Sequence, residues 1–428
     1  MKTSKYNFYY RMNDKEWIIY NTRTLGLSII TNNELEEIKH IEANDRLAHK
    51  NNELQQELFK SGFLVEDECN ELKIIKNRLN KNRYSENALN ITIAPTLECN
   101  FKCAYCYECK GEEKSSKKMT LDIEKNVIEF VRKKLKKCKR MTVVWYGGEP
   151  MLAFDTIDRV SNIFMEMCRE NGVMYEASMI TNGYLLDKIT VKDLKKIKIN
   201  SLQITLDGSK KIHDSKRMLK NDKGTYDKII ANLKEIQPDI QCTIRHNIDK
   251  KNYKYVEKFL SDLSKEHLEN VEVYFAPVTN YEDINDPMCF TEQEFADIWW
   301  KCYKIASEKN LCRKGIMIPP CSFYCDADYV NGFVIDAEGY VYKCWQDIGV
   351  KCKSCGNVGR VSQNYSQLYY EYMTYDATSD SKCKECKILP ICMGGCPFDR
   401  VNGNQHCSRY KYILEHVVRN MVGENEHD

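Results

Sequence analysis

The chain has 428 residues, a formal net charge of +2 and 21 cysteines. This length is enough for two or three domains, and the near-neutral charge gives no general attraction to nucleic acid or to an anionic membrane. Residues 1–20 lack the apolar core of a signal peptide, and no apolar run approaches the ~18 residues that span a bilayer. We therefore expect a soluble, cytoplasmic protein with neither a nucleic-acid nor a membrane partner.

The first 88 residues contain short strand and helix patterns. Strands are expected over 7–11, 16–20, 27–30 and 63–65, and helices over 32–41, with Thr31 as N-cap, and over 51–60. The charged stretch 73–86 is interpreted as a linker. We predict that residues 1–88 form a winged-helix-like module.

Residues 89–300 alternate strands with amphipathic helices. Strands are expected over 89–94, 141–146, 176–181, 201–206, 240–246 and 270–276, and helices over 121–137, 155–170, 191–197, 226–236 and 253–266. Such alternation implies an α/β fold with parallel pairing and right-handed crossovers. We expect an open, partial (β/α)6 barrel of the TIM type, although a doubly wound sheet gives the same periodicity. In both folds chemistry belongs at the carboxyl ends of the strands.

Cysteines gather toward the end of the chain, where 11 of the 21 lie from Cys312 onward. We predict a separate cysteine-rich module over 301–428. In a long chain without an export signal, clustered cysteines indicate metal binding rather than disulfides. The cysteines that stand alone are interpreted as ordinary thiols: Cys69, Cys138, Cys168, Cys242, Cys289, Cys302 and Cys312.

Three cysteines, Cys99, Cys103 and Cys106, directly follow the first predicted barrel strand. Three thiolates in one tight loop suit a [4Fe–4S] cluster with one iron left without a protein ligand. Such an iron can bind a small molecule through two donor atoms. The alternative is a structural zinc site, which needs a fourth ligand; Cys109 is the candidate.

This spacing resembles that of the radical S-adenosylmethionine (SAM) superfamily, including the aromatic Tyr105 before the third cysteine, for which the resemblance implies a cofactor contact. Gly147-Gly148-Glu149-Pro150, after the second strand, resembles the family's GGEP motif. In the family, the backbone and glutamate of that motif bind the SAM ammonium group. The alternative is a plain glycine turn with Pro150 starting a helix.

Further matches follow the later strands, and for each the alternative is a capping or surface role. The resemblance implies a ribose contact for Asn182, and it places Thr205 in a run that ends Asp207-Gly208, similar to the family's S-x-D-G. His213-Asp214-x-x-Arg217 resembles H-D-x-x-R. Arg217 would pair with the SAM carboxylate, which suits its planar fork. Arg245 and Asn247, at the end of the fifth strand, are further candidates.

The late cysteines resemble the SPASM extension of peptide-modifying radical SAM enzymes, which holds two auxiliary [4Fe–4S] clusters; a zinc ribbon is the alternative. The resemblance implies one cluster on Cys383, Cys386, Cys392 and Cys407, and another on Cys325, Cys344, Cys396 and, as candidate fourth ligand, Cys321. Cys321 is closer to Cys325 than the family pattern has it, so full ligation and an open iron are both possible. Cys352 and Cys355 fall outside the pattern.

The resemblance implies that the protein uses SAM and three [4Fe–4S] clusters. A reduced cluster at Cys99, Cys103 and Cys106 would split SAM into methionine and a 5′-deoxyadenosyl radical, which removes a hydrogen atom from the substrate. A ferredoxin or flavodoxin would donate the electron. Residues 1–88 contain 14 Lys and Arg against 14 Asp and Glu, unlike a DNA-binding module. They resemble instead a leader-recognition element, which binds a leader peptide as an added strand.

We therefore expect a maturase that cross-links a ribosomally made precursor peptide, with a thioether from a Cys sulfur to carbon as the preferred product. A carbon–carbon or carbon–oxygen cross-link is the first alternative. The second is an anaerobic sulfatase-maturing enzyme, which makes formylglycine. The third is a non-enzymatic iron–sulfur carrier or peptide-binding regulator.

Overall fold

The computed structural model describes residues 1–43, 52–106, 118–268, 270–279, 286–313, 315–316, 318, 325–360, 365–404 and 406–423. The chain divides into two compact units. The first comprises Met1–Tyr84, Gly315–Cys325 and Tyr375–Asp428, and the second comprises Ser85–Lys314 and Asp326–Thr374. No helix among the described residues is both long enough and apolar enough to cross a bilayer.

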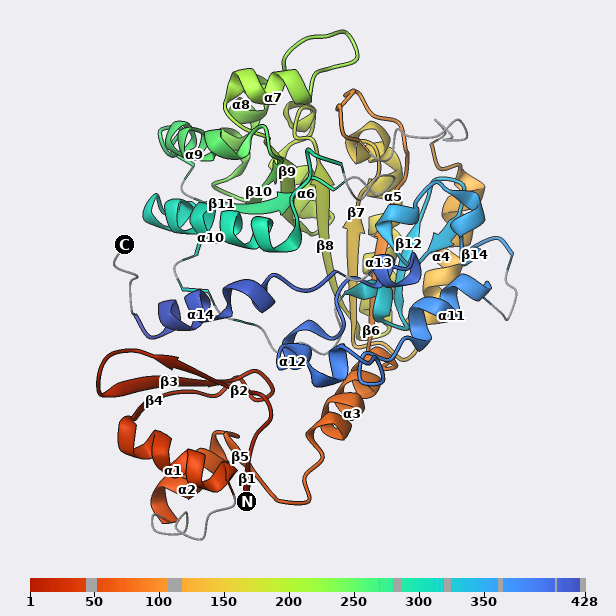
Figure 1. Cartoon of the computed structure of the whole chain (residues 1–428). Helices are drawn as coiled ribbons and strands as arrows, with labels where there is room; N and C mark the ends of the chain where they lie inside the picture. The colour runs from red at the N-terminus through yellow and green to blue at the C-terminus, as the bar shows by residue number, and fades with distance from the viewer. Residues whose placement is uncertain are drawn as a thin grey trace. The chain divides into compact units, whose positions relative to one another are not determined.

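The second unit is built on one nine-stranded sheet (Figure 1). Its parallel strands are β6 (Ala88–Ile93), β7 (Arg140–Trp145), β8 (Met174–Thr181), β9 (Ile199–Thr205), β10 (Gln241–Ile248) and β11 (Val271–Pro277), which neighbour one another in chain order. In a doubly wound sheet the order of strands reverses partway, because later strands are added on the other side of the first one. The uninterrupted order therefore confirms the partial barrel and excludes the doubly wound alternative.

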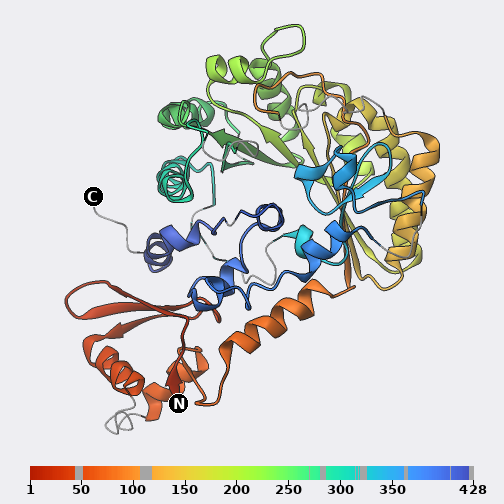
Figure 2. The same cartoon turned by 45° about the vertical axis from the view of Figure 1, so that its right-hand side comes forward.

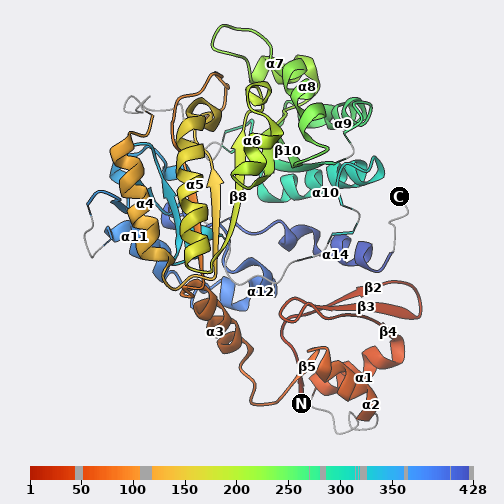
Figure 3. The ribbon, with the colours of Figure 1, turned by 180° about the vertical axis from the view of Figure 1, so that it is seen from behind.

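The helices of the second unit flank the sheet on its outer, convex side (Figures 2 and 3). They are α4 (Leu121–Leu135), α5 (Phe154–Glu170), α6 (Val191–Lys196), α7 (Lys210–Lys216), α8 (Tyr226–Ile236), α9 (Val256–Ser264) and α10 (Glu292–Glu308). The strands pack through residues that are at most 1% exposed, such as Ile91, Val143 and Ile204. Each such side chain stabilises the fold by about 1.5–3 kcal/mol.

Residues 326–374 extend this sheet instead of leaving it. Strand β12 (Gly332–Ile335) pairs in parallel with β6, and β13 (Tyr340–Tyr342) and β14 (Gly356–Asn357) continue antiparallel. Helix α11 (Gln367–Thr374) follows. The predicted boundary at residue 300 falls inside α10, which begins with a Thr291–Glu294 capping box.

The first unit holds a three-stranded antiparallel sheet and helices on both of its faces (Figure 1). Its elements are β1 (Lys2–Thr3), β2 (Asn7–Arg11), β3 (Glu16–Asn21), β4 (Leu27–Thr31), α1 (Asn32–Glu42), α2 (Asn52–Lys60), β5 (Leu64–Val65), α3 (Glu71–Arg83), α12 (Leu389–Cys392), α13 (Pro397–Val401) and α14 (Tyr410–Met421). Thr31 caps α1 as predicted. Helices α1 and α2 cover one face of the sheet, and α14 lies on the other.

The linker interpretation of residues 73–86 is wrong, because helix α3 occupies Glu71–Arg83. Its buried residues Ile75 and Leu79, four apart, fall on one face. They pack with Tyr6 and with Ala377, Leu389 and Met393 from the end of the chain. The N-terminal segment and the C-terminal cysteine segment therefore share a hydrophobic core.

Candidate functional site

The candidate site lies in the second unit, at the carboxyl ends of the parallel strands. The chain leaves β6 at Ile93 and reaches Cys99, Cys103 and Cys106 in the loop that follows. Residues Gly147–Glu149 follow β7, Asn182 follows β8, Thr205 ends β9, and Arg245 lies on β10. Parallel pairing brings these loops to one edge of the sheet.

The glycine turn lies directly against the segment that enters the cysteine loop. Gly148 N donates to Thr96 O (3.2 Å), and Glu149 N donates to Glu98 O (2.8 Å). A Cβ on Gly148 would lie 2.3 Å from Glu98 O and 2.5 Å from Leu97 O. A Cβ on Gly147, where φ is +114°, would lie 2.3 Å from Thr96 O. Only glycine permits this approach of two backbones.

The Glu149 side chain is fully buried and links its own turn to the end of β8. Its carboxylate accepts hydrogen bonds from Met151 N (3.0 Å), Thr181 Oγ1 (2.7 Å) and Asn182 N (2.7 Å). Burial raises its pKa to about 7, although these three hydrogen bonds act to lower it. The carboxylate thus holds the glycine turn against the end of β8, and its contact with SAM stays a prediction.

A second segment pairs with the cysteine loop from the other side. Lys102 N donates to Met218 O (3.0 Å), Ala104 N to Lys216 O (3.1 Å), and Lys220 N to Asn100 O (3.0 Å). The loop is therefore positioned by backbone hydrogen bonds on both flanks. On the β8 side, Asn182 Nδ2 also donates to Asn100 Oδ1 (2.7 Å), beside Cys99.

Tyr105 is held in a buried polar network. Its hydroxyl donates to Asp207 Oδ2 and accepts from Arg217 Nη1 (2.8 Å) and Asn247 Nδ2 (3.2 Å). Asn247 also donates to Asp207 Oδ1 through Nδ2 and through its backbone N–H, both at 3.2 Å. The cysteine loop is thereby joined to the ends of β9 and β10. Asp207, which is 0% exposed, was not among the predicted site residues.

Charge in this network favours an anion-binding role for Arg217. Burial opposes ionisation of Asp207, but Arg217 and the Tyr105 hydrogen bond outweigh it and hold the Asp207 pKa below its usual value. The pKa of Arg217 is raised overall. Burial acts to lower it, but the charges of Tyr105, Cys103 and Asp207 outweigh burial. Arg217 Nε is buried and has no acceptor among the described residues. A carboxylate ligand such as that of SAM would satisfy this donor.

His213 and Asp214 hold the segment that carries Arg217. His213 Nδ1 accepts from Asp207 N (3.3 Å), so Nε2 carries the proton toward Thr225 Oγ1 (3.0 Å), and Thr225 Oγ1 donates to Arg217 O (2.7 Å). Burial lowers the His213 pKa to about 4. Asp214 Oδ1 accepts from the backbone N–H groups of Thr225 and Tyr226. Both residues therefore act through position.

Thr205 and Arg245 are register partners on adjacent strands. Arg245 Nε donates to Asn247 Oδ1 (2.8 Å), and its guanidinium lies over the Tyr274 ring at 5.9 Å. Thr205 is buried at the end of β9. The structure thus brings all the predicted SAM contacts to the same edge of the sheet, and their contacts with the cofactor stay predictions.

The three thiols of the loop lie within electrostatic range of one another. Burial raises the pKa of Cys99 to about 12, and the charge of Cys103 adds to this rise. Burial also raises the pKa of Cys103, and the charge of Cys106 adds to that rise. Crowded, desolvated thiols of this kind ionise when a metal compensates their charge. The donor set fits an iron–sulfur cluster held by Cys99, Cys103 and Cys106. In the described part of the chain, no three His, Cys, Asp or Glu side chains lie close enough together to hold a single metal ion.

The late cysteines divide between the two units. Cys383, Cys386, Cys392 and Cys407 belong to the first unit. Burial raises the pKa of Cys392, and the charges of Cys407 and Cys386 add to this; Cys383 also interacts with Cys392. This set of four thiols, which fits a cluster in donor chemistry, is called the auxiliary site below.

The other predicted set stays a prediction. Cys325 and Cys396 belong to the first unit and Cys344 to the second. Cys321 and Cys109 lie outside the described residues. Cys352 is exposed and Cys355 is buried.

Comparison with known proteins identifies the domain that contains the loop. The model of the radical SAM superfamily matches residues 93–263, which contain the three cysteines, the glycine turn and Arg217. The chain carries a radical SAM domain, and the protein is an enzyme. The non-enzymatic alternative is therefore wrong. A superfamily domain of this type implies a [4Fe–4S] cluster and SAM.

Relatives with this domain cover most of the chain. A cysteine-type anaerobic sulfatase-maturating enzyme of Clostridium novyi is 24% identical over 78% of this chain and 96% of its own. The radical SAM cyclopropyl synthase TigE of Paramaledivibacter caminithermalis is 22% identical over 86% of this chain and 82% of its own.

Two solved structures share the fold. The structure of anSMEcpe with bound AdoMet covers 79% of this chain and 96% of its own, with a TM-score of 0.62 and 17% identity. Streptococcus suis SuiB bound to precursor peptide SuiA covers 94% of this chain and 96% of its own, with a TM-score of 0.54 and 17% identity.

Exchange of Arg217 for Lys is expected to weaken SAM binding about tenfold, because a planar fork with a buried free donor is replaced by a point charge. Equilibrium dialysis with SAM measures this. The control is Arg159→Lys on helix α5. The Arg159 guanidinium donates to Glu124 on α4 (Nη2 to Oε1, 2.6 Å). Equal affinity in wild type and Arg217→Lys would exclude the carboxylate contact.

Proposed function

We propose that this radical SAM enzyme modifies a ribosomally made precursor peptide by hydrogen-atom abstraction and forms an intramolecular cross-link, preferably a thioether from a Cys sulfur to carbon. The observation that carries this proposal is the length shared with relatives. The peptide-bound SuiB structure covers 94% of the chain, whereas the anSMEcpe structure covers 79%. The part of this chain that matches SuiB but lies beyond the match to anSMEcpe gives room for a segment that binds a leader peptide.

The chemistry follows from the site. Cys99, Cys103 and Cys106 would hold a [4Fe–4S] cluster, which when bound would supply the electron for reductive cleavage of SAM to a 5′-deoxyadenosyl radical. Arg217 binds the SAM carboxylate, and the turn Gly147–Glu149 orients the ammonium group. The Tyr105–Asp207–Asn247 network keeps the loop in place while substrate enters. A ferredoxin or flavodoxin is proposed as electron donor.

Formation of a carbon–sulfur bond from a C–H and an S–H removes two hydrogen atoms. One leaves as the abstracted hydrogen atom, and the other leaves as a proton and an electron. The reaction therefore needs an electron acceptor. The auxiliary site is proposed for this role, as is the second set that contains Cys325, Cys344 and Cys396. With the loop Cys99–Cys106, the chain would hold three clusters.

Sulfatase maturation is the second candidate, since three sulfatase-maturating relatives each match 78% of this chain and 96% or more of their own length. A carbon–carbon or carbon–oxygen cross-link is the third.

Mass spectrometry tests these three candidates after anaerobic incubation with a co-encoded cysteine-rich peptide and, separately, with a sulfatase peptide. A cross-link removes two hydrogen atoms, and thiol blocking shows whether a Cys was consumed. Formylglycine formation also exchanges sulfur for oxygen. Uncoupled SAM cleavage with no change in either peptide would contradict all three.

Strand β4 is the proposed docking edge for a leader. It pairs only with β3 among the described residues, and its Ile29 is 45% exposed. The opposite edge strand β2 is already contacted, because Lys387 Nζ donates to Asn7 O (3.1 Å) and Arg419 Nη2 donates to Arg11 O (2.8 Å). An extended peptide can add to the free edge as a fourth strand.

Ile29→Glu is expected to weaken leader-peptide binding about tenfold, because it places a charge on the apolar edge that the peptide covers. Fluorescence anisotropy of a labelled leader measures this. Phe59→Glu on helix α2 is the matched control, since Phe59 is 41% exposed. Equal loss in both variants, or in neither, would contradict the β4 edge.

A further inference from the structure

One face of strands β9, β10 and β11 is polar and partly exposed. The side chains of this face are Ser201, Gln203, Thr243, Arg245, Glu272 and Tyr274. The side chains that alternate with them are at most 3% exposed: Leu202, Ile204, Ile244, Val273 and Phe275.

The polar face is the inner side of the sheet. His246, which lies between Arg245 and Asn247 on β10, stacks on Phe259 of helix α9 with the ring centroids 4.5 Å apart. Arg245 and its neighbours on the same face therefore lie on the side away from the helices (Figure 2). A closed barrel fills this side with branched apolar side chains. A polar and accessible inner face indicates a binding surface instead.

A chain of hydrogen bonds crosses the inner face. The Tyr274 hydroxyl donates to Gln203 Oε1 (2.8 Å) and accepts from Arg245 Nη1 (3.4 Å). Arg245 Nε donates to Asn247 Oδ1 (2.8 Å), and Asn247 Nδ2 donates to the Tyr105 hydroxyl (3.2 Å). The chain thus joins Gln203 on β9 to the loop that carries Cys99, Cys103 and Cys106.

The end of this chain at Gln203 can still donate hydrogen bonds. Since Oε1 of Gln203 accepts from Tyr274, its Nε2 is turned away from that hydroxyl, and Nε2 has no partner among the described residues. Thr243 is the register partner of Gln203 on β10, and its hydroxyl has no hydrogen bond to any residue that the structure describes. An amide N–H donates, and a hydroxyl can donate or accept. Both groups are therefore available to a ligand.

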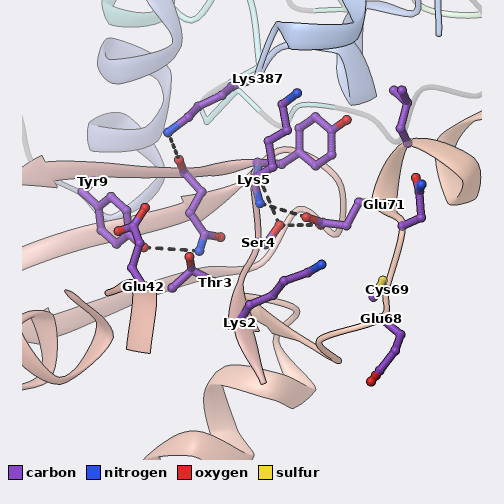
Figure 4. Close-up of a pocket in the computed structure, with 14 residues that line it drawn as sticks. Lys2, Thr3, Ser4, Lys5, Tyr9, Glu42, Glu68, Cys69, Glu71 and Lys387 are labelled. Carbon is purple, nitrogen blue, oxygen red and sulfur yellow. Dashed lines mark hydrogen bonds between the residues drawn. The ribbon is translucent and has the colours of Figure 1, made fainter. Parts of the chain in front are cut away.

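The pocket of the first unit differs in this respect. It has a volume of about 620 Å³, and its polar side chains bind other parts of the same unit (Figure 4). Glu71 accepts from Ser4 Oγ (2.6 Å) and Lys5 N (2.8 Å). Lys387 Nζ donates to Asn7 O (3.1 Å). These groups hold the unit together, whereas the Gln203 amide is oriented by the protein and left with two N–H donors to offer.

We propose that Gln203 Nε2 donates a hydrogen bond to a backbone carbonyl of the substrate peptide, with the Thr243 hydroxyl as a neighbouring contact and with Tyr274 and Arg245 as positioning residues. This inference rests on the proposed function, in which the substrate is a peptide. Every residue of a peptide presents a backbone carbonyl acceptor, so the contact suits a cysteine-rich precursor and a sulfatase peptide equally. Because the same hydrogen-bond chain ends at Tyr105, it holds the bound backbone in a fixed position relative to the cysteine loop.

Gln203→Glu tests the carbonyl contact, because it replaces the Nε2 donor by an oxygen of similar size and keeps an acceptor for Tyr274. The KM for the co-encoded cysteine-rich peptide is expected to rise about tenfold, since the peptide carbonyl then faces an acceptor. The number of 5′-deoxyadenosine molecules released per modified peptide is expected to rise as well. Chromatography of the nucleoside and mass spectrometry of the peptide measure both quantities.

Gln241→Glu is the matched control. It makes the same exchange on the same strand at an exposed position two residues before Thr243, and it is expected to change neither quantity. A wild-type KM in Gln203→Glu, or an equal rise in Gln241→Glu, would overturn the carbonyl contact. A tenfold loss of SAM affinity in Gln203→Glu, measured by equilibrium dialysis, would also overturn it, because Gln203 would then act on the cofactor.

These results would leave the proposed function standing. The proposed function itself fails if the wild-type protein modifies neither the cysteine-rich peptide nor a sulfatase peptide, and the carbonyl contact then fails with it.

The positioning role of Tyr274 has a separate test. Tyr274→Phe is expected to raise the KM for the peptide several-fold, because the Gln203 amide loses the hydroxyl that orients it. In Gln203→Met, which removes the amide, the same exchange is expected to cause no further rise. Additive rises in the double variant would show that Tyr274 acts independently of Gln203 and would remove Tyr274 from the proposal.

Discussion

Cys99→Ala is expected to abolish 5′-deoxyadenosine formation and to lower the iron content by about four atoms per chain, the complement of one [4Fe–4S] cluster. The reason is that Cys99 is one of the three thiols proposed to hold the cluster, so its loss leaves only Cys103 and Cys106. The measurements are chromatography of the nucleoside products under reducing, anaerobic conditions and iron analysis of the reconstituted protein.

Cys168→Ala is the control for this change. Cys168 is also a buried thiol in the second unit, but its sulfur lies against Met141 Sδ (3.8 Å) on β7. Loss of that thiol is expected to leave both readouts unchanged apart from a small cost in stability. Continued SAM cleavage by Cys99→Ala would contradict the assignment of the loop as the cofactor site.

The second large effect is expected from a single methyl group. Gly148→Ala places a Cβ 2.3 Å from Glu98 O and 2.5 Å from Leu97 O, and both atoms are backbone that immediately precedes Cys99. Because neither can rotate away, the glycine turn or the cysteine loop must move. Displacements of about 1 Å in a catalytic constellation cost about 100-fold in rate. We expect at least this loss in the initial rate of SAM cleavage.

Gly356→Ala is the matched control, since a Cβ there first meets Tyr365 at 4.0 Å. Iron content and thermal unfolding of Gly148→Ala separate misplacement of the loop from general unfolding. We expect the cooperative unfolding transition to remain. A wild-type rate in Gly148→Ala would show that the two backbones do not need their close approach.

Local patterns predicted much of the barrel. Strand and helix periodicity found β6 to β11 within a few residues, because alternating burial is encoded within each strand. Strand order could not be read in this way. Whether β9 neighbours β8 or lies across the sheet depends on packing between distant helices, so only the structure separates a barrel from a doubly wound sheet.

Helix α3 shows the opposite limit. Its sequence is mostly charged, and its apolar residues Ile75 and Leu79 gave too weak a stripe to outweigh the linker interpretation. Their partners Leu389 and Met393 are about 300 residues away, so no local pattern could identify them. Helix α10 differs from α3, because Thr291 and Glu294 have the spacing of a capping box, which is a local signal for the start of a helix.

In the candidate site, sequence motifs identified the residue types but not their connections. Tyr105 was expected as a cofactor contact, and its hydroxyl is also the centre of a network with Arg217, Asn247 and Asp207. Asp207 had a usable signal, since it is an acidic residue followed by Gly208 at the end of a buried strand. Its partners come from three other segments, which only folding brings together.

The shared core of α3 and the C-terminal segment has a consequence for how the protein is made. Leu79 leaves the ribosome about 300 residues before its packing partners Leu389 and Met393, and at 5–20 residues per second this interval lasts roughly 15–60 s. During that time the apolar face of α3 lacks its C-terminal partners Ala377, Leu389 and Met393. A chaperone would therefore be expected to bind the N-terminal part of the nascent chain during this period. The period ends only when translation reaches the last cysteines.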